Sequence, residues 1–423
     1  MNEMKKTSLT IYCLLCTVFL MGLEISVTAT SELHVHNIDT GLDYATIHEA
    51  INAPETVNGH TILVDAGRYY ENLVINKSIS IIGENRHSTI IDGRTGFPWV
   101  DTVIYVSAEK VTLAGFTIRG GKPYCQSLGI KITSDRNNIS NNLIIHNRKG
   151  IWVLRSFYNL ISNNGFLSND DEALWLTGTF NNTIIGNTFS NGYCGILLED
   201  SRRNKILHNN FINNTKHAIS RSPTNINIWD GAHPSGGNYW SDHTHVDLDY
   251  DGIGDSPHTL SPLPTQEPSD NYPLMGMFSS FKATPDHYIQ TVCNSTISDF
   301  QFDSGTIRFN VTAKEDTTGF CRVCIPKALL NDTYRVFVND TEVPHTLLSF
   351  SNSTHSYLYF TYPHSTQEVV IIPEFPLFTI LPLLMIATLS FALIKRWQGD
   401  IKTSPKRFRG KTLRAHMFNH ILV

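Results

Sequence analysis

The chain has 423 residues, of which 41% are hydrophobic and 17% are charged. This length exceeds what one hydrophobic core usually organises, so we expect at least two domains. The net charge is −5, but eight Lys and Arg residues follow position 394 against a single acid, so the rest of the chain is more acidic than the total. An acidic body without a basic stripe argues against nucleic acid as a partner.

Both ends carry apolar segments that are typical of export and anchoring. Residues 1–29 combine Lys5 and Lys6 with an apolar run and small residues, as a secretory signal peptide does, and a retained N-terminal anchor is the alternative. Residues 377–394 contain no charge and would span about 27 Å as a helix, enough to cross a bilayer. The basic residues of 395–423 fit a short cytoplasmic tail. We therefore predict a single-pass protein of the cell membrane with an extracellular N-terminal ectodomain.

Nine Asn-x-Ser/Thr acceptors for glycosylation lie between these ends, as expected of a glycoprotein at the cell surface. They are Asn76, Asn138, Asn181, Asn213, Asn294, Asn310, Asn331, Asn339 and Asn352. The Pro-Glu-Phe-Pro sequence at 373–376 resembles the anchoring signal of archaeal surface proteins, which a peptidase cuts in some families. Such signals normally end soon after the first basic residues, so the long tail favours a plain anchor.

The middle of the chain repeats with a period of 22 residues, marked by Asn147, Asn169, Asn191 and Asn213. Each period holds short alternating apolar clusters between Asn, Ser and Gly, a pattern that indicates short strands and turns. A leucine-rich horseshoe has a similar period, but it needs an outer helix or extended segment, and no helical stretch is evident. We predict a right-handed parallel β-helix in which the Asn columns form hydrogen-bonded ladders.

A short helix over 44–51 is predicted to plug the first coil of this solenoid. Ile47, Ala50 and Ile51 share one face of that helix, and Thr46 with Glu49 forms a candidate capping box. A solenoid needs such a cover because its first coil has no neighbour on one side.

The repeat region opens with Thr-Ile-His-Glu-Ala-Ile at 46–51 and Ile-Leu-Val-Asp-Ala-Gly-Arg-Tyr-Tyr-Glu-Asn at 62–72. These residues resemble the opening of pectin lyase-like β-helix proteins, pectinesterases included. The closing segments Gly-Asn-Tyr-Trp-Ser-Asp at 237–242 and Asp-Asn-Tyr-Pro-Leu at 270–274 resemble the NosD-type family more closely. That resemblance, over residues 40–278, implies a β-helix that binds or hydrolyses carbohydrate, and a link to copper delivery for nitrous oxide reductase. It is specific for fold rather than for function.

An outward row of side chains on the β-helix is the candidate ligand-binding surface. If Ile151 and Val153 point inward, Trp152 between them points outward. The same alternation in neighbouring coils gives the row Lys131, Trp152, Trp175, Leu197 and Ile219. Two stacked outward tryptophans predict either a platform for sugars or a patch covered by another part of the protein. The segment between Gly121 and Leu128 is the candidate cover.

Acidic residues flank this row, namely Asp170, Asp171, Glu172, Glu199 and Asp200. Glycoside hydrolysis needs two carboxylates about 5 to 9.5 Å apart with one protonated, and neighbouring coils could supply that spacing. Acids in a solvated turn are also common without any function. The paired-Asp and Gly-His-Gly motifs of polygalacturonases and the Gln/Asp/Arg signatures of pectinesterases are absent. The resemblance therefore carries no catalytic residue over, and whether the chain is an enzyme stays open.

Residues 247–255, Asp-Leu-Asp-Tyr-Asp-Gly-Ile-Gly-Asp, match the pattern of a calcium loop. The expected ligands are Asp247, Asp249, Asp251, Asp255 and the carbonyl of Ile253. The position of the usual bidentate Glu is His258, so the affinity should be modest unless another residue, such as Asp242, contributes. An acidic turn without an ion is the alternative.

Copper is not predicted from the residues themselves. The pairs His34 with His36 and His243 with His245 have copper-like spacing, but such pairs are weak evidence in a chain with 18 His. No cluster of Met and His accompanies them.

The repeat stops after the Pro-rich stretch 256–273. Alternating strands over 307–311, 334–338 and 357–362 predict a small β-sandwich. Similar modules beside the anchor of archaeal β-helix surface proteins imply a stalk or interaction role. Because an exported domain permits disulfides, Cys293 is predicted to pair with Cys321 or Cys324.

The predicted chain is thus all-β, with a right-handed parallel β-helix at 30–278, a β-sandwich at 279–372 and a C-terminal transmembrane helix. The predicted function is a surface-anchored protein that binds polysaccharide or envelope glycan and is stabilised by calcium. The alternatives are a glycan hydrolase or lyase, a surface-layer adhesin or scaffold, and a NosD-like copper-related protein.

Overall fold

The computed structural model describes residues 34–93, 102–120, 127–221, 227–244, 246–260, 269–330, 333–374 and 385–395. The predicted signal peptide, the basic tail and most of the candidate cover over the tryptophan row lie outside the described residues.

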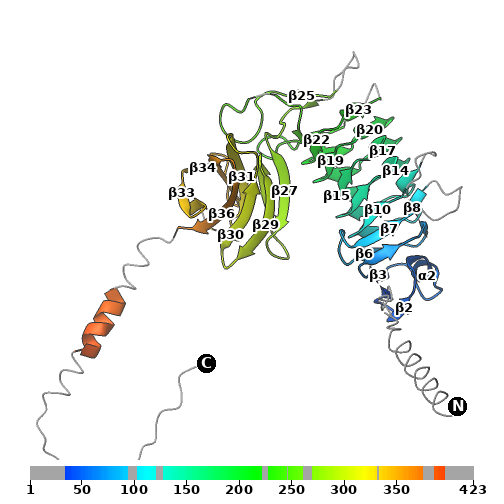
Figure 1. Ribbon diagram of the computed structural model, residues 1–423, viewed down its shortest axis with the longest axis horizontal. Coiled ribbons are helices and arrows are strands. Elements are labelled where there is room, and N and C mark those ends of the chain that lie inside the picture. Colours follow the sequence, from blue (N-terminus) through cyan, green and yellow to red (C-terminus); the bar gives the residue numbers. More distant parts are fainter. Residues whose placement is uncertain are drawn as a thin grey trace, which may run out of the picture.

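The N-terminal part of the chain is a parallel β-helix of about seven coils, as the 22-residue period predicts (Figure 1). Three sheets run along it, and their strands pair in parallel except where the first strand, β1, meets β2 and β3. Turns rather than helices join the strands of the described coils, so the horseshoe alternative is wrong.

The first sheet has nine strands: β2 (Leu42–Tyr44), β1 (Val35–Asn37), β3 (Thr61–Val64), β6 (Ser80–Gly83), β9 (Thr112–Ala114), β12 (Asn138–Ser140), β15 (Leu160–Ser162), β18 (Thr183–Ile185) and β21 (Lys205–Leu207). The second has eight: β4 (Gly67–Tyr69), β7 (Thr89–Asp92), β10 (Thr117–Arg119), β13 (Leu143–Ile145), β16 (Gly165–Leu167), β19 (Thr188–Ser190), β22 (Asn210–Ile212) and β24 (Tyr239–Trp240). The third has seven: β5 (Leu73–Ile75), β8 (Thr102–Val106), β11 (Leu128–Ile132), β14 (Lys149–Leu154), β17 (Glu172–Thr177), β20 (Cys194–Glu199) and β23 (Lys216–Ser220).

Buried asparagines at the turns form the predicted ladders. Two ladders hold five asparagines each, and the one that Asp270 extends, the longest, runs through Asn142, Asn164, Asn187, Asn209 and Asn238. At each step the backbone N–H of one Asn donates to the side-chain oxygen of the next, at 2.9 to 3.0 Å. A ladder therefore satisfies buried backbone groups that the turns leave without strand partners.

The asparagines that recur every 22 residues, from Asn147 to Asn213, form the predicted ladder only in part. The backbone N–H of Asn147 donates to the Asn169 side chain at 3.1 Å. Asn191 and Asn213 instead occupy exposed turns with φ of 53° and 51°. Asn tolerates this left-handed backbone better than most residues, so the repeated identity there reflects turn geometry and not a buried rung.

Helix α2 (Ile47–Asn52) covers the first coil and buries Ile47, Ala50 and Ile51, as predicted. The Thr46 hydroxyl accepts a hydrogen bond from the Glu49 backbone at 3.1 Å. The first two helical N–H groups, those of Ile47 and His48, donate to the Glu71 carboxylate. A residue of a later coil therefore completes the cap.

Asp270 closes the opposite end of the longest ladder. Its carboxylate accepts hydrogen bonds from the Asn238 backbone at 2.7 Å and the Trp240 indole at 2.9 Å. Burial raises the pKa of Asp270 to about 7 even though these bonds favour its charged form. The short strands β25 (His258–Thr259) and β26 (Ser269–Asp270) hold it in place.

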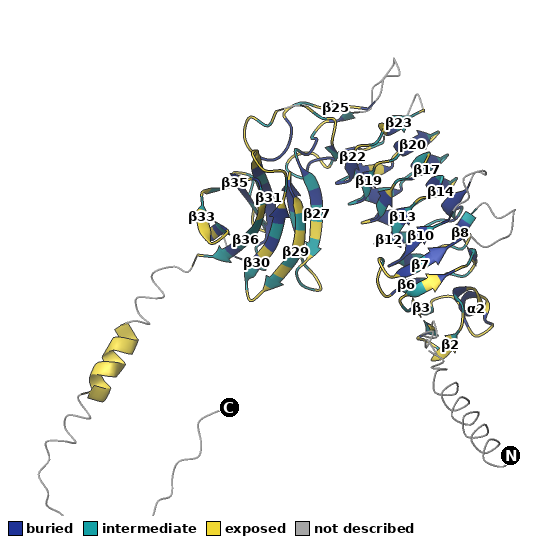
Figure 2. Ribbon diagram, in the orientation of Figure 1, coloured by how far each residue is buried: buried dark blue, intermediate teal, exposed yellow. Residues whose placement is uncertain are grey.

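The second domain is a sandwich of two five-stranded antiparallel sheets with one buried core. Exposed and buried residues alternate along its strands (Figure 2). The three predicted strands correspond to β30 (Thr306–Thr312), β32 (Tyr334–Val338) and β35 (His355–Pro363). One sheet contains β27 (Met277–Lys282), β28 (Tyr288–Cys293), β31 (Thr318–Pro326), β35 (His355–Pro363) and β34 (His345–Leu347). The other contains β29 (Thr296–Asp303), β30 (Thr306–Thr312), β36 (Thr366–Pro373), β32 (Tyr334–Val338) and β33 (Thr341–Val343).

The two domains meet where the last coil contacts β27. Asn210 and Phe278 exchange two hydrogen bonds, at 2.9 and 2.8 Å, and the Phe278 ring stacks on His208 at 4.2 Å. Strand β27 thus belongs to the sandwich although it begins before the predicted boundary of 278.

Within the described residues, no helix is long and apolar enough to cross a membrane. Residues 385–395 form an exposed helix, and the earlier part of the predicted span, 377–384, lies outside the described residues (Figure 2). The predicted transmembrane helix is therefore unsupported.

Candidate functional site

The outward row on the third sheet is the candidate site. Cross-strand partners place these residues in line: Val74, Tyr105, Lys131, Trp152, Trp175, Leu197 and Ile219. The predicted order of the row is thus confirmed, since side chains alternate between the two faces of a strand. The structure adds Tyr105 and Val74 at its start. Leu197, by contrast, is buried, which shortens the accessible part of the row.

The two tryptophans of the row stack on each other. Their ring centroids are 4.7 Å apart with an interplanar angle of 10°, and both side chains are half-buried. The Lys131 ammonium lies 5.0 Å from the Trp152 ring, and the Lys149 ammonium lies 4.1 Å from the Trp175 ring. These contacts are cation–π interactions and hold both rings in place.

Hydrogen bonds fix the indole orientation as well. Trp152 donates its ring N–H to the Thr177 hydroxyl, and Trp175 donates to the Glu199 carboxylate, each at 3.0 Å. Because the rings stack along the row, their faces contact each other and the lysines. Any ligand would therefore meet mainly the ring edges and the polar groups beside them.

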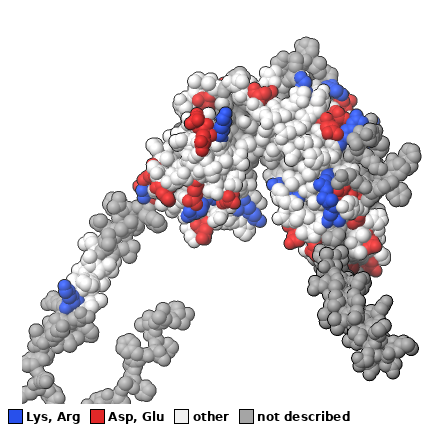
Figure 3. Space-filling view, in the orientation of Figure 1, with Lys and Arg blue, Asp and Glu red and all other residues white. Residues whose placement is uncertain are grey.

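The flanking acids are mostly held in ion pairs. Asp171 pairs with Arg148 at 2.8 Å, Glu172 with Lys149 at 2.7 Å, and Glu199 with Arg221 at 2.8 Å. On the face drawn in Figure 3, acidic and basic side chains accordingly lie beside one another on the β-helix. Asp170 and Asp200 are exposed in turns, and Asp200 has a φ of 47°.

These contacts give the acids a structural role. A carboxylate that already accepts hydrogen bonds from a cation is a poor candidate for the protonated acid that glycoside hydrolysis requires. The structure therefore brings the five predicted acids near the tryptophans without assembling a recognisable acid and base pair from them.

Lys149 is a further residue of this site that the sequence did not indicate. It is buried between Glu172 and the Trp175 ring. Its position at the start of β14 resembles an ordinary strand end, and only the stacking of the next coil brings it under the indole.

The acidic loop at 247–255 brings three carboxylates together. Oxygen atoms of Asp247, Asp249 and Asp255 lie within 4.8 Å of one another, a spacing suited to a hard cation. Gly252 has a φ of 82°, the left-handed backbone expected of the tight turn. Burial raises the pKa of Asp247 to about 6, and the charge of Asp251 adds to this shift.

Asp251, the fourth predicted carboxylate ligand, is not part of this cluster. The Asp251 carboxylate accepts a hydrogen bond from the backbone of Ile253 at 2.7 Å and contacts His233 at 2.9 Å. Ile253 itself is buried and packs in a small cluster with Leu274 and Phe278. Asp251 therefore braces the loop against the rest of the β-helix.

The histidine pairs do not gather in one place. His36 contacts Asp43 at 2.6 Å at the start of the chain, which raises the pKa of the His36 imidazole. His243 packs against His258 with ring centroids 5.5 Å apart at the other end, and His245 lies outside the described residues. Among the described residues, a group of three or more possible metal ligands with metal-binding spacing occurs in the acidic loop and not at these histidines.

The strand pairing defines the first domain as a parallel β-helix. Residues 45–245 match the family model described as periplasmic copper-binding protein (NosD). The NosD-type resemblance of the sequence is therefore confirmed for this segment.

A cell surface glycoprotein of Methanothermus fervidus is 35% identical over 88 residues, which are 21% of this chain and 14% of that protein. The chain thus matches only about a seventh of the length of this relative. The similarity supports an extracellular or surface location.

Solved structures of pectin methylesterases are also similar. PemA from Erwinia chrysanthemi is 13% identical, with a TM-score of 0.28 over 55% of this chain and 82% of that one. The carrot enzyme is 14% identical, with a TM-score of 0.30 over 52% of this chain and 89% of that one. No functional residue is transferred from either enzyme.

Proposed function

We propose that this protein is displayed at the cell surface and binds an envelope polysaccharide along the outward row. The observation that carries this proposal is the stacked pair Trp152 and Trp175, flanked by Lys131 and Lys149. A surface location is supported by the similarity to a cell surface glycoprotein. Aromatic side chains with a polar tip are well suited to sugars, which present both C–H and O–H groups.

The proposed contact is edge-on. The sugar chain would lie across the coils, with C–H groups against the indole edges and hydroxyls hydrogen-bonded to Lys131 and Glu199. Both polar groups are partly exposed. Because each coil adds one residue to the row about every 4.8 Å, the row suits an extended chain better than a single sugar.

Trp175→Ala should weaken polysaccharide binding about tenfold, because it removes one aromatic contact and unstacks Trp152. The measurement is retention of the full chain on an array of neutral and acidic polysaccharides. Phe180→Ala is the matched control, since Phe180 stacks on Phe157 at 3.8 Å outside the row. Equal losses in both variants, or no retention of the wild type on any polysaccharide, would contradict the proposal and favour a surface scaffold.

The same array separates binding from catalysis. Release of sugar products by the wild type, lost in Asp171→Asn, would favour a glycan hydrolase or lyase. Retention without product release is expected here, because Asp171 is already paired with Arg148.

We also propose that calcium occupies the acidic loop and stabilises the end of the β-helix. The three close carboxylates repel one another, and a divalent cation would offset this repulsion. Isothermal titration of the full chain should give a dissociation constant of roughly 0.1 to 1 mM, the range of extracellular calcium modules. Asp249→Asn should abolish the uptake, whereas Asp286→Asn, an exposed acid of the sandwich, should not. Absence of uptake by the wild type at millimolar calcium would rule the site out.

A further inference from the structure

Two of the nine Asn-x-Ser/Thr acceptors differ from the others in their surroundings. Asn76 and Asn213 are exposed, and no other described residue forms a hydrogen bond with either side-chain amide. Asn331 lies outside the described residues. The remaining acceptors are half-buried, or their amides are already hydrogen-bonded.

Asn76 directly follows β5, the outermost strand of the third sheet. No strand of the described sheet lies beyond β5, so one flank of Asn76 has no neighbouring rung. The two residues after it are fixed to the first coil. Lys77 donates to the Ala53 carbonyl at 2.8 Å, and the backbone N–H of Ser78 donates to the Asn58 side chain at 2.9 Å. These bonds hold the acceptor sequence at the surface and leave the Asn76 amide unoccupied.

Asn213 occupies the turn just before β23, the outer strand at the opposite end of the same sheet. The next residue, Asn214, is held inward, since its side chain donates to the Phe189 carbonyl at 2.8 Å and accepts the backbone N–H of Gly192 at 3.1 Å. The left-handed backbone at Asn213, with a φ of 51°, leaves its own side chain exposed. Thr215, the third residue of the acceptor sequence, is exposed as well.

Asn138 and Asn181 are half-buried because other coils flank them on both sides. Asn138 lies in β12 between β9 and β15, and its side-chain oxygen is buried. The pairing of Phe180 with both neighbouring coils places Tyr158 and Arg203 beside Asn181. Because coils are only about 4.8 Å apart, a sugar on either Asn would collide with the adjacent side chains.

The described acceptors of the sandwich use their amides in hydrogen bonds. Asn294 and Asn310 donate from their amide nitrogens, at 3.1 and 2.9 Å. Asn339 and Asn352 accept backbone N–H groups with their side-chain oxygens. A transferase acting on the folded chain would have to break these bonds before it could bind the amide.

We propose that Asn76 and Asn213 carry N-linked glycans and that the other described acceptors stay unmodified. The donor is an oligosaccharide joined to a lipid through phosphate. The amide nitrogen attacks the anomeric carbon, so a C–N bond forms while the C–O bond to phosphate breaks. The amide loses one proton, and the lipid phosphate leaves with the bonding electron pair. This modification rests on the proposed surface location, because such acceptors are used in exported chains.

Glycopeptide mass spectrometry tests the proposal on the full chain, isolated from the envelope of the cells that produce it. Peptides that contain Asn76 or Asn213 should carry a glycan in most molecules, and peptides with any other described acceptor should be unmodified. A bare Asn76 or Asn213 would overturn the proposal, as would comparable occupancy at Asn138 or Asn181.

Labelling of intact cells with a membrane-impermeant reagent checks the surface location separately. A labelled chain without glycans would contradict the glycans alone. An unlabelled chain without glycans would contradict the proposed location as well.

Thr215→Ala should lower the mass of the full chain by one glycan, because the acceptor sequence needs the hydroxyl of its third residue. Thr215→Ser keeps that hydroxyl and should keep the glycan. Thr183→Ala is the matched control, since it destroys the acceptor sequence of Asn181 and should leave the glycan mass unchanged. A glycan lost in Thr183→Ala, or none lost in Thr215→Ala, would refute the assignment. The wild-type glycopeptides decide the matter even if a variant does not fold.

Discussion

Asn187→Ala is expected to lower the free energy of unfolding by about 3 to 5 kcal/mol, a large effect for one polar side chain. Asn187 is fully buried in the middle of the longest ladder. Its amide nitrogen donates to the Ile161 carbonyl at 2.8 Å and to the Asn209 side chain at 3.0 Å. Its oxygen accepts the backbone N–H of Asn164 at 2.9 Å.

Alanine would leave buried backbone groups of two coils unpaired, where water cannot reach them without opening the turn. The loss should be measured by urea unfolding, followed by tryptophan fluorescence. Thr183→Ala is the matched control, because Thr183 lies in the same coil but its side chain points outward. It should cost less than about 1 kcal/mol. A similar small loss for both variants would show that the ladder is not a main source of stability.

This ladder shows how far the sequence alone predicts the fold. A period of 22 residues with period-two apolar clusters determines the coil, because each coil must present the same inward positions as its neighbour. It also predicts the order of the outward row. The two ends of the β-helix are harder to predict from the sequence. Glu71 caps helix α2 from a later coil, and Asp270 closes the ladder although it lies 32 residues beyond Asn238. Neither partner is marked by local spacing.

In the candidate site too, local sequence rules predict some features, whereas contacts between distant residues determine the others. Trp152 and Trp175 could be placed from strand alternation, a local rule. The ion pairs that occupy the flanking acids could not, because each joins residues of neighbouring coils. The loop at 247–255 contains four acids in a calcium-like pattern, but contact with His233 draws Asp251 out of the cluster. Sequence patterns therefore identify candidates, and contacts between coils decide their roles.

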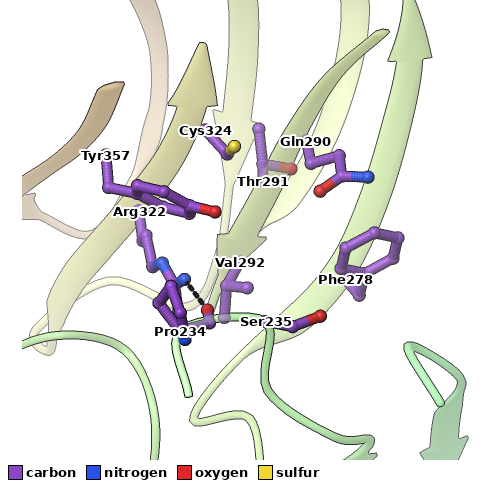
Figure 4. Close-up of a pocket in the computed structure, with 9 residues that line it drawn as sticks. All are labelled: Pro234, Ser235, Phe278, Gln290, Thr291, Val292, Arg322, Cys324 and Tyr357. Carbon is purple, nitrogen blue, oxygen red and sulfur yellow. Dashed lines mark hydrogen bonds between the residues drawn. The ribbon is translucent and has the colours of Figure 1, made fainter. Parts of the chain in front are cut away.

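Oxidation of the full chain is expected to join Cys293 to Cys321 and to leave Cys324 free. The sequence alone did not decide whether Cys293 pairs with Cys321 or with Cys324. The structure makes Cys293 and Cys321 direct cross-strand neighbours in β28 and β31, both with fully buried thiols. Cys324 instead lies opposite Gln290 and lines a small cavity at the junction of the two domains (Figure 4). Directly opposed residues of antiparallel strands have Cα separations of about 4.5 to 5.5 Å, within the range of disulfides.

The reaction needs an oxidant, for which oxidised glutathione is suitable. The two protein thiols lose two protons and two electrons as the S–S bond forms, and the glutathione disulfide is reduced to two thiols. The bond would close the loop from 293 to 321 in the unfolded chain, which in the loop-entropy model stabilises the fold by roughly 3 to 4 kcal/mol. Urea unfolding before and after oxidation measures this gain.

Peptide mapping without reduction identifies the bond itself. A linked pair of peptides containing Cys293 and Cys321 is expected, and Cys321→Ser should remove both the link and the gain in stability. Cys324→Ser is the matched control and should change neither. A link between Cys293 and Cys324 would require the register of β28 against β31 to shift, since Cys321 and Cys324 are three residues apart and point to opposite faces of the strand. Finding that link, or only free thiols after oxidation, would therefore contradict the pairing observed in the sandwich core.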